Sequence, residues 1–103
     1  MLLIRETMHC KPGKVKPMVE KFKTMSKLNE KAGMGKMRIM TDFAGDRYWT
    51  IVAEFEVENL SKFEAMMRGE GMSPEMGKEM EKIMKDYHDL IEFGKREIYK
   101  IEN

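Results

Sequence analysis

RYWTIVAEFEV, residues 47–57, carries the clearest period in the chain. Every second residue is apolar and would share one face of an extended strand: Trp49, Ile51, Ala53, Phe55 and Val57. The residues between them are mixed: Tyr48, Thr50, Val52, Glu54 and Glu56. A period of two with many β-branched and aromatic residues is typical of a central strand with one buried face. We therefore predict a strand over residues 47–57 and expect the other segments to pack around it.

The flanking segments predict two helical regions and three further strands. Apolar residues at helical spacing indicate a helix over residues 14–31. Asn59 is a good N-cap for a short helix that ends near Gly69, and Ser73-Pro74-Glu75 is a strong start signal for another. Alternation predicts strands over residues 2–9, 36–43 and 96–101, with residues 44–46 as a hairpin turn.

The resulting order of elements is β-α-β-β-α-β, which is the ferredoxin-like pattern. We predict one α+β domain over residues 1–103, with a four-stranded antiparallel sheet and helices on one face. The opposite face of the sheet would be too apolar for water and too charged for a core. A second copy of the chain would cover it, so we expect a homodimer with Arg5, Tyr48, Val52 and Glu54 at the interface.

The composition of the chain limits which partners and which cellular compartment we expect for this protein. The 19 basic and 18 acidic side chains nearly cancel, and no basic block stands apart, so nucleic acid is not an expected partner. Cys10 is the single cysteine, which excludes an internal disulfide and fits a reducing compartment. The apolar start is too short for a signal peptide or a membrane span. We expect a cytoplasmic protein without a membrane partner.

Three features together resemble the dimeric α/β-barrel superfamily, including its antibiotic-biosynthesis monooxygenase-like and NIPSNAP-like groups. They are a strand starting Ile4-Arg5-Glu6, the helix-opening Lys11-Pro12-Gly13-Lys14 with the later hairpin, and the short helix at Asn59. The resemblance covers nearly the whole chain. It implies two ferredoxin-like sheets facing each other in one barrel, and a ligand pocket in each subunit between sheet and helices. Members of the superfamily include cofactor-free oxygenases, haem-degrading enzymes, decarboxylases and many proteins of unknown activity.

The resemblance also bears on cofactors. Haem-degrading members would have an asparagine, a tryptophan and a histidine at positions matching Glu6, Met66 and roughly Met76, and none of these is present here. A metal site is not expected at the adjacent His9 and Cys10, because neighbours on a strand point to opposite faces and zinc needs three or four protein ligands. We expect no cofactor and no metal.

Glu6 is the candidate catalytic residue, because it shares a strand face with Ile4 and Met8 that should point to the helices. A desolvated carboxylate there would suit a general base. The alternatives are pairing with a lysine at the barrel end, or a strand that faces the other way. The predicted ligand-binding walls are Phe22, Trp49, Met66, Met80 and Met84. The helical spacing of Met76, Met80 and Met84 also fits ordinary core packing.

The leading functional hypothesis is a cofactor-independent, monooxygenase-like enzyme that holds an apolar or aromatic small molecule between sheet and helices. Glu6 would form the substrate's anion, which reacts with oxygen directly. One alternative is a ligand-binding protein without chemistry. Another is a structural dimer whose core is filled by the methionines, of which the chain has 13.

Overall fold

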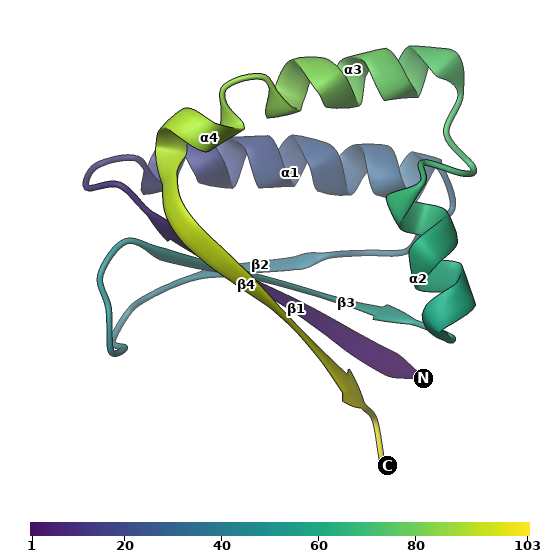
Figure 1. Ribbon diagram of the computed structural model, residues 1–103, viewed down its shortest axis with the longest axis horizontal. Coiled ribbons are helices and arrows are strands. Elements are labelled where there is room, and N and C mark those ends of the chain that lie inside the picture. Colours follow the sequence, from purple (N-terminus) through teal and green to yellow (C-terminus); the bar gives the residue numbers. More distant parts are fainter.

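A computed structural model describes residues 1–103 as one sheet with helices on one side (Figure 1). The elements, in chain order, are β1 (Leu2–Cys10), α1 (Val15–Lys31), β2 (Arg38–Thr41), β3 (Thr50–Val57), α2 (Leu60–Met67), α3 (Pro74–Met84), α4 (Tyr87–Leu90) and β4 (Ile91–Lys100). The α+β class and the helix-covered antiparallel sheet are confirmed.

The strands lie in the order β2-β3-β1-β4, and every pair of neighbours is antiparallel. The register places Ile39, Ala53, Glu6 and Arg96 in one row across the sheet, on the face toward the helices. The adjacent row, on the open face, consists of Arg38, Glu54, Arg5 and Glu97. Because side chains alternate along a strand, these two rows decide what each face can contact.

The core lies between the sheet and α1. Ile4, Met18 and Ile51 are fully buried, and Phe22 packs in the same layer at 4% exposure. The apolar alternation of residues 51–57 therefore has the role predicted for it, because Ile51, Ala53, Phe55 and Val57 are all buried. A second cluster at the other end of the sheet joins Phe63 of α2 to Ile4 and Phe55.

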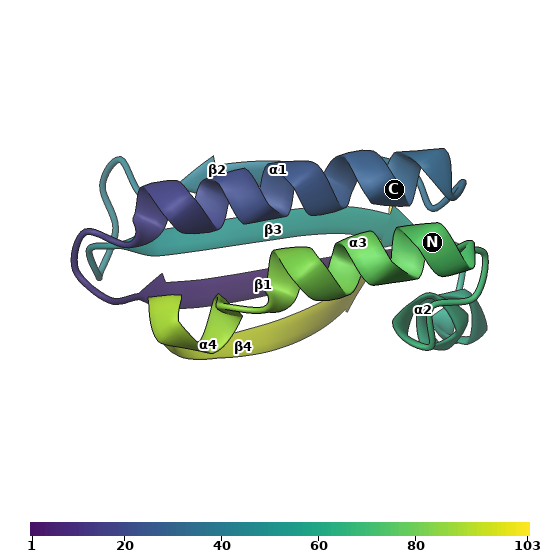
Figure 2. The same ribbon diagram turned by 90° about the horizontal axis from the view of Figure 1, so that it is seen from above.

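The N-cap signals at the later helices act as the sequence indicates. The Asn59 side chain accepts a hydrogen bond from the Lys62 amide at 2.9 Å, and Ser73 accepts one from Met76 at 3.2 Å. The α3 helix buries none of its residues completely and packs chiefly on α1. Seen from above, α1 lies over β2 and β3, whereas α3 lies over the β1 side (Figure 2).

The prediction of a strand over residues 47–57 is wrong at its first three residues. β3 begins at Thr50, and Trp49 has a left-handed backbone with φ 61°. The Trp49 carbonyl still accepts a hydrogen bond from the Cys10 amide at 2.8 Å, and Trp49 lines a hollow with Val15, the first residue of α1. The Asp42 carboxylate accepts from the Thr50 amide at 2.8 Å and closes the loop over residues 43–49.

The other strand boundaries also shift. β2 is shorter than the predicted residues 36–43, and Phe43 is fully exposed in the loop that follows it. β4 begins five residues earlier than predicted, directly after the short α4. None of the helices is long and apolar enough to cross a lipid bilayer.

Candidate functional site

A cavity of about 240 Å³ lies between the sheet and the helices. Its wall is mainly apolar and is formed by Glu6, Met8, Phe22, Met25, Asn29, Met37, Phe55, Met66, Met67, Met84, Tyr87 and Arg96. The side chain of Arg96 is 46% exposed and Met67 is 51% exposed, so the cavity meets solvent between β4 and α2. The space exists because α3 packs on α1 rather than on β1 and β4.

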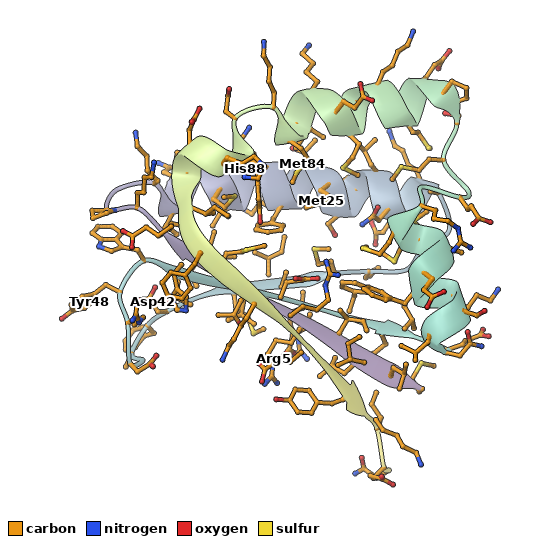
Figure 3. The ribbon with its side chains drawn as sticks, viewed as in Figure 1. Arg5, Met25, Asp42, Tyr48, Met84 and His88 are labelled. Carbon is orange, nitrogen blue, oxygen red and sulfur yellow. The ribbon has the colours of Figure 1, made fainter.

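Six of the thirteen methionines line this cavity, and they come from β1, α1, the segment before β2, α2 and α3. Met25 on α1 and Met84 at the end of α3 reach it from the helices (Figure 3), and Met8 reaches it from β1. Thioether side chains are flexible and polarizable, so such a wall adapts its shape to an apolar guest. The methionine enrichment seen in the sequence is thus concentrated around one space.

Glu6 forms an ion pair with Arg96 on the neighbouring strand β4. The Arg96 Nε donates to Oε1 of the carboxylate, and only 14% of the Glu6 side chain is exposed. The Arg96 guanidinium also lies 5.2 Å from the centre of the Phe63 ring. Glu6 therefore faces the helices as predicted, and its cation comes from β4 rather than from a lysine.

Tyr87 opens α4 and brings a hydroxyl to the same cavity. This hydroxyl donates a hydrogen bond to the Met8 sulfur at 3.1 Å. Burial raises the pKa of Tyr87, and the nearby negative charge of Glu6 raises it further. The phenol therefore stays protonated and remains a hydrogen-bond donor. Asn29, 7% exposed on α1, adds an amide that can donate or accept.

The structure brings four of the predicted site residues together and leaves two outside. Glu6, Phe22, Met66 and Met84 line the cavity. Trp49 lies in the loop before β3 at 43% exposure, and Met80 is on α3 outside the lining. Trp49 precedes β3 and lines a separate hollow with Val15 at the start of α1.

Sequence reasoning missed Tyr87 and Arg96 as wall residues, although both bring polar groups. The signal for Arg96 lies in the pairing of β1 with β4, because Glu6 and Arg96 are direct partners. We predicted that the last strand begins at Arg96, and with that boundary its pairing with Glu6 in the middle of β1 was not recognised. Tyr87 reads as one more apolar position of a helix, and only the break between α3 and α4 turns it toward Met8.

The open face of the sheet carries an ion-pair row. Arg5 Nε lies 2.6 Å from Glu54 Oε2, and an Arg38 nitrogen lies 3.6 Å from Glu54 Oε1. Arg5 is labelled below the sheet in Figure 3, on the side away from the helices. The Asp42 carboxylate takes no part in this row and accepts a hydrogen bond from the backbone amide of Thr50.

Aromatic residues flank this row. Tyr99 donates to Glu97 at 2.6 Å and lies under the Arg5 guanidinium, 5.3 Å from ring centre to Cζ. Phe93 stacks against His9 with 4.5 Å between ring centres. Both Phe93 and Tyr99 are close to half-exposed. Tyr48, predicted at an interface, lies in the loop before β3 and is 84% exposed.

No cluster of three histidine, cysteine, aspartate or glutamate side chains is arranged to bind a metal ion. Cys10 is 3% exposed, and its burial raises the pKa of the thiol. A larger hollow of about 480 Å³ lies between residues 32–35 and α2, but its wall is mostly polar or glycine. The methionine-lined cavity has a mainly apolar wall that includes the buried Asn29 amide, which is the usual character of a ligand site.

Comparison with known proteins identifies the fold of this chain. No family model and no curated protein matches the sequence. Among solved structures, a NIPSNAP domain protein from Burkholderia xenovorans, described as uncharacterized, matches with a TM-score of 0.77 at 13% identity over 99% of this chain and 95% of that chain.

Two NIPSNAP family proteins from Agrobacterium tumefaciens are similarly close. One, of unknown function, has a TM-score of 0.75 at 17% identity, covering 98% of this chain and 87% of that one. The other has a TM-score of 0.76 at 11% identity, covering 99% and 93%. At such low identity the likeness is one of fold. The chain has the ferredoxin-like α+β fold of NIPSNAP-family structures, as the sequence resemblance implied.

Proposed function

We propose that this protein binds a small, mainly apolar molecule in the methionine-lined cavity between sheet and helices. The observation that carries the proposal is the wall itself: nine of its twelve residues are hydrophobic, and the Glu6–Arg96 pair stands among them. An ion pair at an otherwise apolar wall gives a guest both a surface to bury against and a polar group to orient it.

The size of the cavity limits the guest. Pockets for drug-sized ligands measure roughly 300–1,000 Å³, and this one is smaller at about 240 Å³. A one- or two-ring molecule fits that space. Because the charges of Glu6 and Arg96 cancel, the cavity suits a neutral guest better than an ion, whose desolvation would not be compensated.

Calorimetric titration with indane, a neutral two-ring hydrocarbon, tests this binding. Wild-type protein should bind indane at one site per chain. Met84→Trp should abolish binding, because the larger ring fills the cavity from the end of α3. The matched control is Met80→Trp, one turn earlier on the same helix and outside the lining, which should bind as wild type does.

Two results would count against the cavity. Indane binding that survives in Met84→Trp would place the guest elsewhere. Failure of wild-type protein to bind any neutral one- or two-ring compound would leave the methionines as core filling. Circular dichroism of both tryptophan variants should match that of wild type, which confirms that loss of binding is not loss of fold.

Catalysis is a second candidate function, in which Glu6 acts as the base of a cofactor-independent, monooxygenase-like reaction. The position of Glu6 on the cavity wall supports it. A substrate would have to displace Arg96 from the carboxylate before Glu6 could accept its proton. The test is oxygen consumption with 1-naphthol, an electron-rich phenol. Glu6→Gln should lose turnover and retain binding of indane; equal turnover in both proteins would exclude Glu6 as the base.

The partner of the open face is, in this proposal, a second copy of the chain. The row Arg38, Glu54, Arg5 and Glu97 alternates in sign, so the same row reversed end to end is complementary to it. Half-exposed Phe93 and Tyr99 supply apolar area beside it. A two-fold dimer presents the same patch from both subunits, which is what a self-complementary row requires.

Light scattering coupled to size exclusion tests the dimer. Wild-type protein should elute as a dimer, and Val52→Lys should elute as a monomer, because Val52 lies in the adjacent row of the open face. Ser61→Lys, on the exposed surface of α2, adds the same charge and should remain dimeric. A wild-type monomer would contradict the proposal. The buried, unpaired Cys10 is compatible with the cytoplasmic location that we also propose.

A further inference from the structure

The hydroxyl of Tyr87 donates its hydrogen bond to a weak acceptor. It donates to the Met8 sulfur at 3.1 Å, and a thioether is a poor acceptor compared with an oxygen atom. The residue nevertheless lies at the cavity wall, on the short helix that leads directly into β4. A stronger acceptor that entered the cavity would therefore gain this hydrogen bond at little cost.

Gly94 makes that arrangement possible. A Cβ atom at this position would lie 2.5 Å from the Met8 sulfur and 3.1 Å from the Thr7 carbonyl oxygen. The sulfur of Met8 thus occupies the space that a side chain at position 94 would take. The absence of a side chain on β4 fixes Met8, and Met8 in turn fixes the resting position of the Tyr87 hydroxyl.

Two of the remaining polar groups of the wall, Arg96 and Tyr87 itself, are hydrogen-bond donors. The Glu6 carboxylate is already engaged by Arg96, whose other guanidinium nitrogens carry further N–H groups. The Tyr87 hydroxyl is kept protonated by its burial and by the charge of Glu6. A guest that brings an acceptor oxygen is matched by the Tyr87 and Arg96 donors, whereas a pure hydrocarbon leaves the stronger hydrogen bond of Tyr87 unused.

Building on the binding function proposed above, we propose that Tyr87 sets the class of ligand: a neutral ring compound that carries a carbonyl oxygen. In the complex, the hydroxyl leaves the Met8 sulfur and donates to that oxygen. Tyr87 is then a specificity-determining residue, and the apolar part of the guest packs against the methionines. No covalent step is involved.

The test compares indane with 1-indanone, which has the same ring skeleton plus one carbonyl group. One net hydrogen bond is expected to make 1-indanone bind about two- to tenfold more tightly to wild-type protein. Tyr87→Phe should bind both compounds with the affinity that wild type has for indane. Tyr99→Phe, which removes the hydroxyl on the open face, should keep the preference for 1-indanone.

The outcomes separate this inference from the binding proposal. Equal affinity of wild type for the two compounds, or a preference that survives in Tyr87→Phe, overturns the role of Tyr87 and leaves the cavity in place. Failure of both compounds to bind overturns both proposals. The Met8 methyl resonance gives an independent reading in the wild-type protein: 1-indanone should shift it more than indane, and an equal shift would contradict the inference.

Discussion

The two faces of the sheet are formed by the same strands and have opposite characters. On the helix-facing side, the row Ile39, Ala53, Glu6 and Arg96 contains one ion pair beside a cavity. One residue along each strand, the open face carries the row Arg38, Glu54, Arg5 and Glu97, in which every member is charged. A shift of one residue therefore separates the proposed ligand site from the proposed subunit interface.

The difference shows where charge is useful in this fold. On the helix-facing side, a single pair among apolar residues can orient a guest, because few other polar groups compete for it. On the open face, the alternating signs match a copy of the same surface and would oppose a large apolar partner. Substitutions of neighbouring residues that point to opposite faces test this difference between the two faces.

The largest effect is expected from the neighbours Ile51 and Val52 on β3. Ile51 is fully buried, so Ile51→Ala should lower the free energy of unfolding by about 2–5 kcal/mol through lost contacts and the cavity left behind. Val52 is half-buried on the open face. Val52→Ala should cost about 1 kcal/mol or less. Urea denaturation measures both, and equal losses would mean that the two faces are equally buried.

A smaller effect is expected at Gly94, where the helix-facing side has no room. Gly94→Ala should destabilise the protein by about 1–3 kcal/mol, because its methyl group meets the Met8 sulfur. Gly77 on α3 is the control, since a methyl group there meets nothing within 4 Å. Gly77→Ala should stabilise the protein by about 0.5–1 kcal/mol through helix propensity. A neutral or stabilising Gly94→Ala, measured by thermal unfolding, would contradict the packing of Met8.

Two arginine–glutamate ion pairs have the same geometry but differ in their exposure to solvent. Arg5–Glu54 on the open face and Arg68–Glu70 after α2 each have Nε and Oε2 2.6 Å apart. The Glu54 side chain is 11% exposed and that of Glu70 is 58% exposed. Glu54→Gln should cost about 1–3 kcal/mol in denaturant unfolding, whereas Glu70→Gln should cost about 0.5 kcal/mol or less. Equal small costs would indicate that the open face is fully solvated.

The smallest effect concerns alkaline pH. Because the pKa of Tyr87 is raised in the folded state, the unfolded chain loses this proton first, near pH 10. The folded state then binds more protons, so its stability falls as pH rises above about 10. Tyr87→Phe should make that fall less steep when unfolding is followed between pH 9 and 11. An unchanged slope would mean that the phenol is hydrated.

The sequence was sufficient for the sheet, the helices and the faces of β1 and β3, because strict alternation and N-cap residues act locally. It placed Glu6 on the correct face and selected Phe22, Met66 and Met84 from the cavity wall. It failed where apolar alternation continues into the loop between β2 and β3. Phe43 and Trp49 fit the apolar pattern, yet both lie in a loop closed by the Asp42 side chain.

The rest of the site depends on contacts between distant segments. The partner of Glu6 follows from the register of β1 against β4, and the role of Met8 follows from a missing side chain 86 residues later, at Gly94. The cavity exists because α3 rests on α1 instead of on the sheet. None of these is visible in a local pattern, so composition could suggest a methionine-lined space but could not locate it.

The central claim is that one face of the sheet binds the ligand and the other binds a second subunit. Its most direct test is a methionine-methyl NMR spectrum of wild-type protein, followed during titration with 1-indanone and during dilution. The methyl groups of Met8, Met25, Met37, Met66, Met67 and Met84 should shift with the ligand, while Met40, on the open face of β2, should not. Dilution should move Met40 and leave the cavity methyl groups unchanged. If the ligand shifts Met40 as strongly as the cavity methyl groups, or if dilution shifts none of the resonances, the separation of ligand site and subunit interface is contradicted.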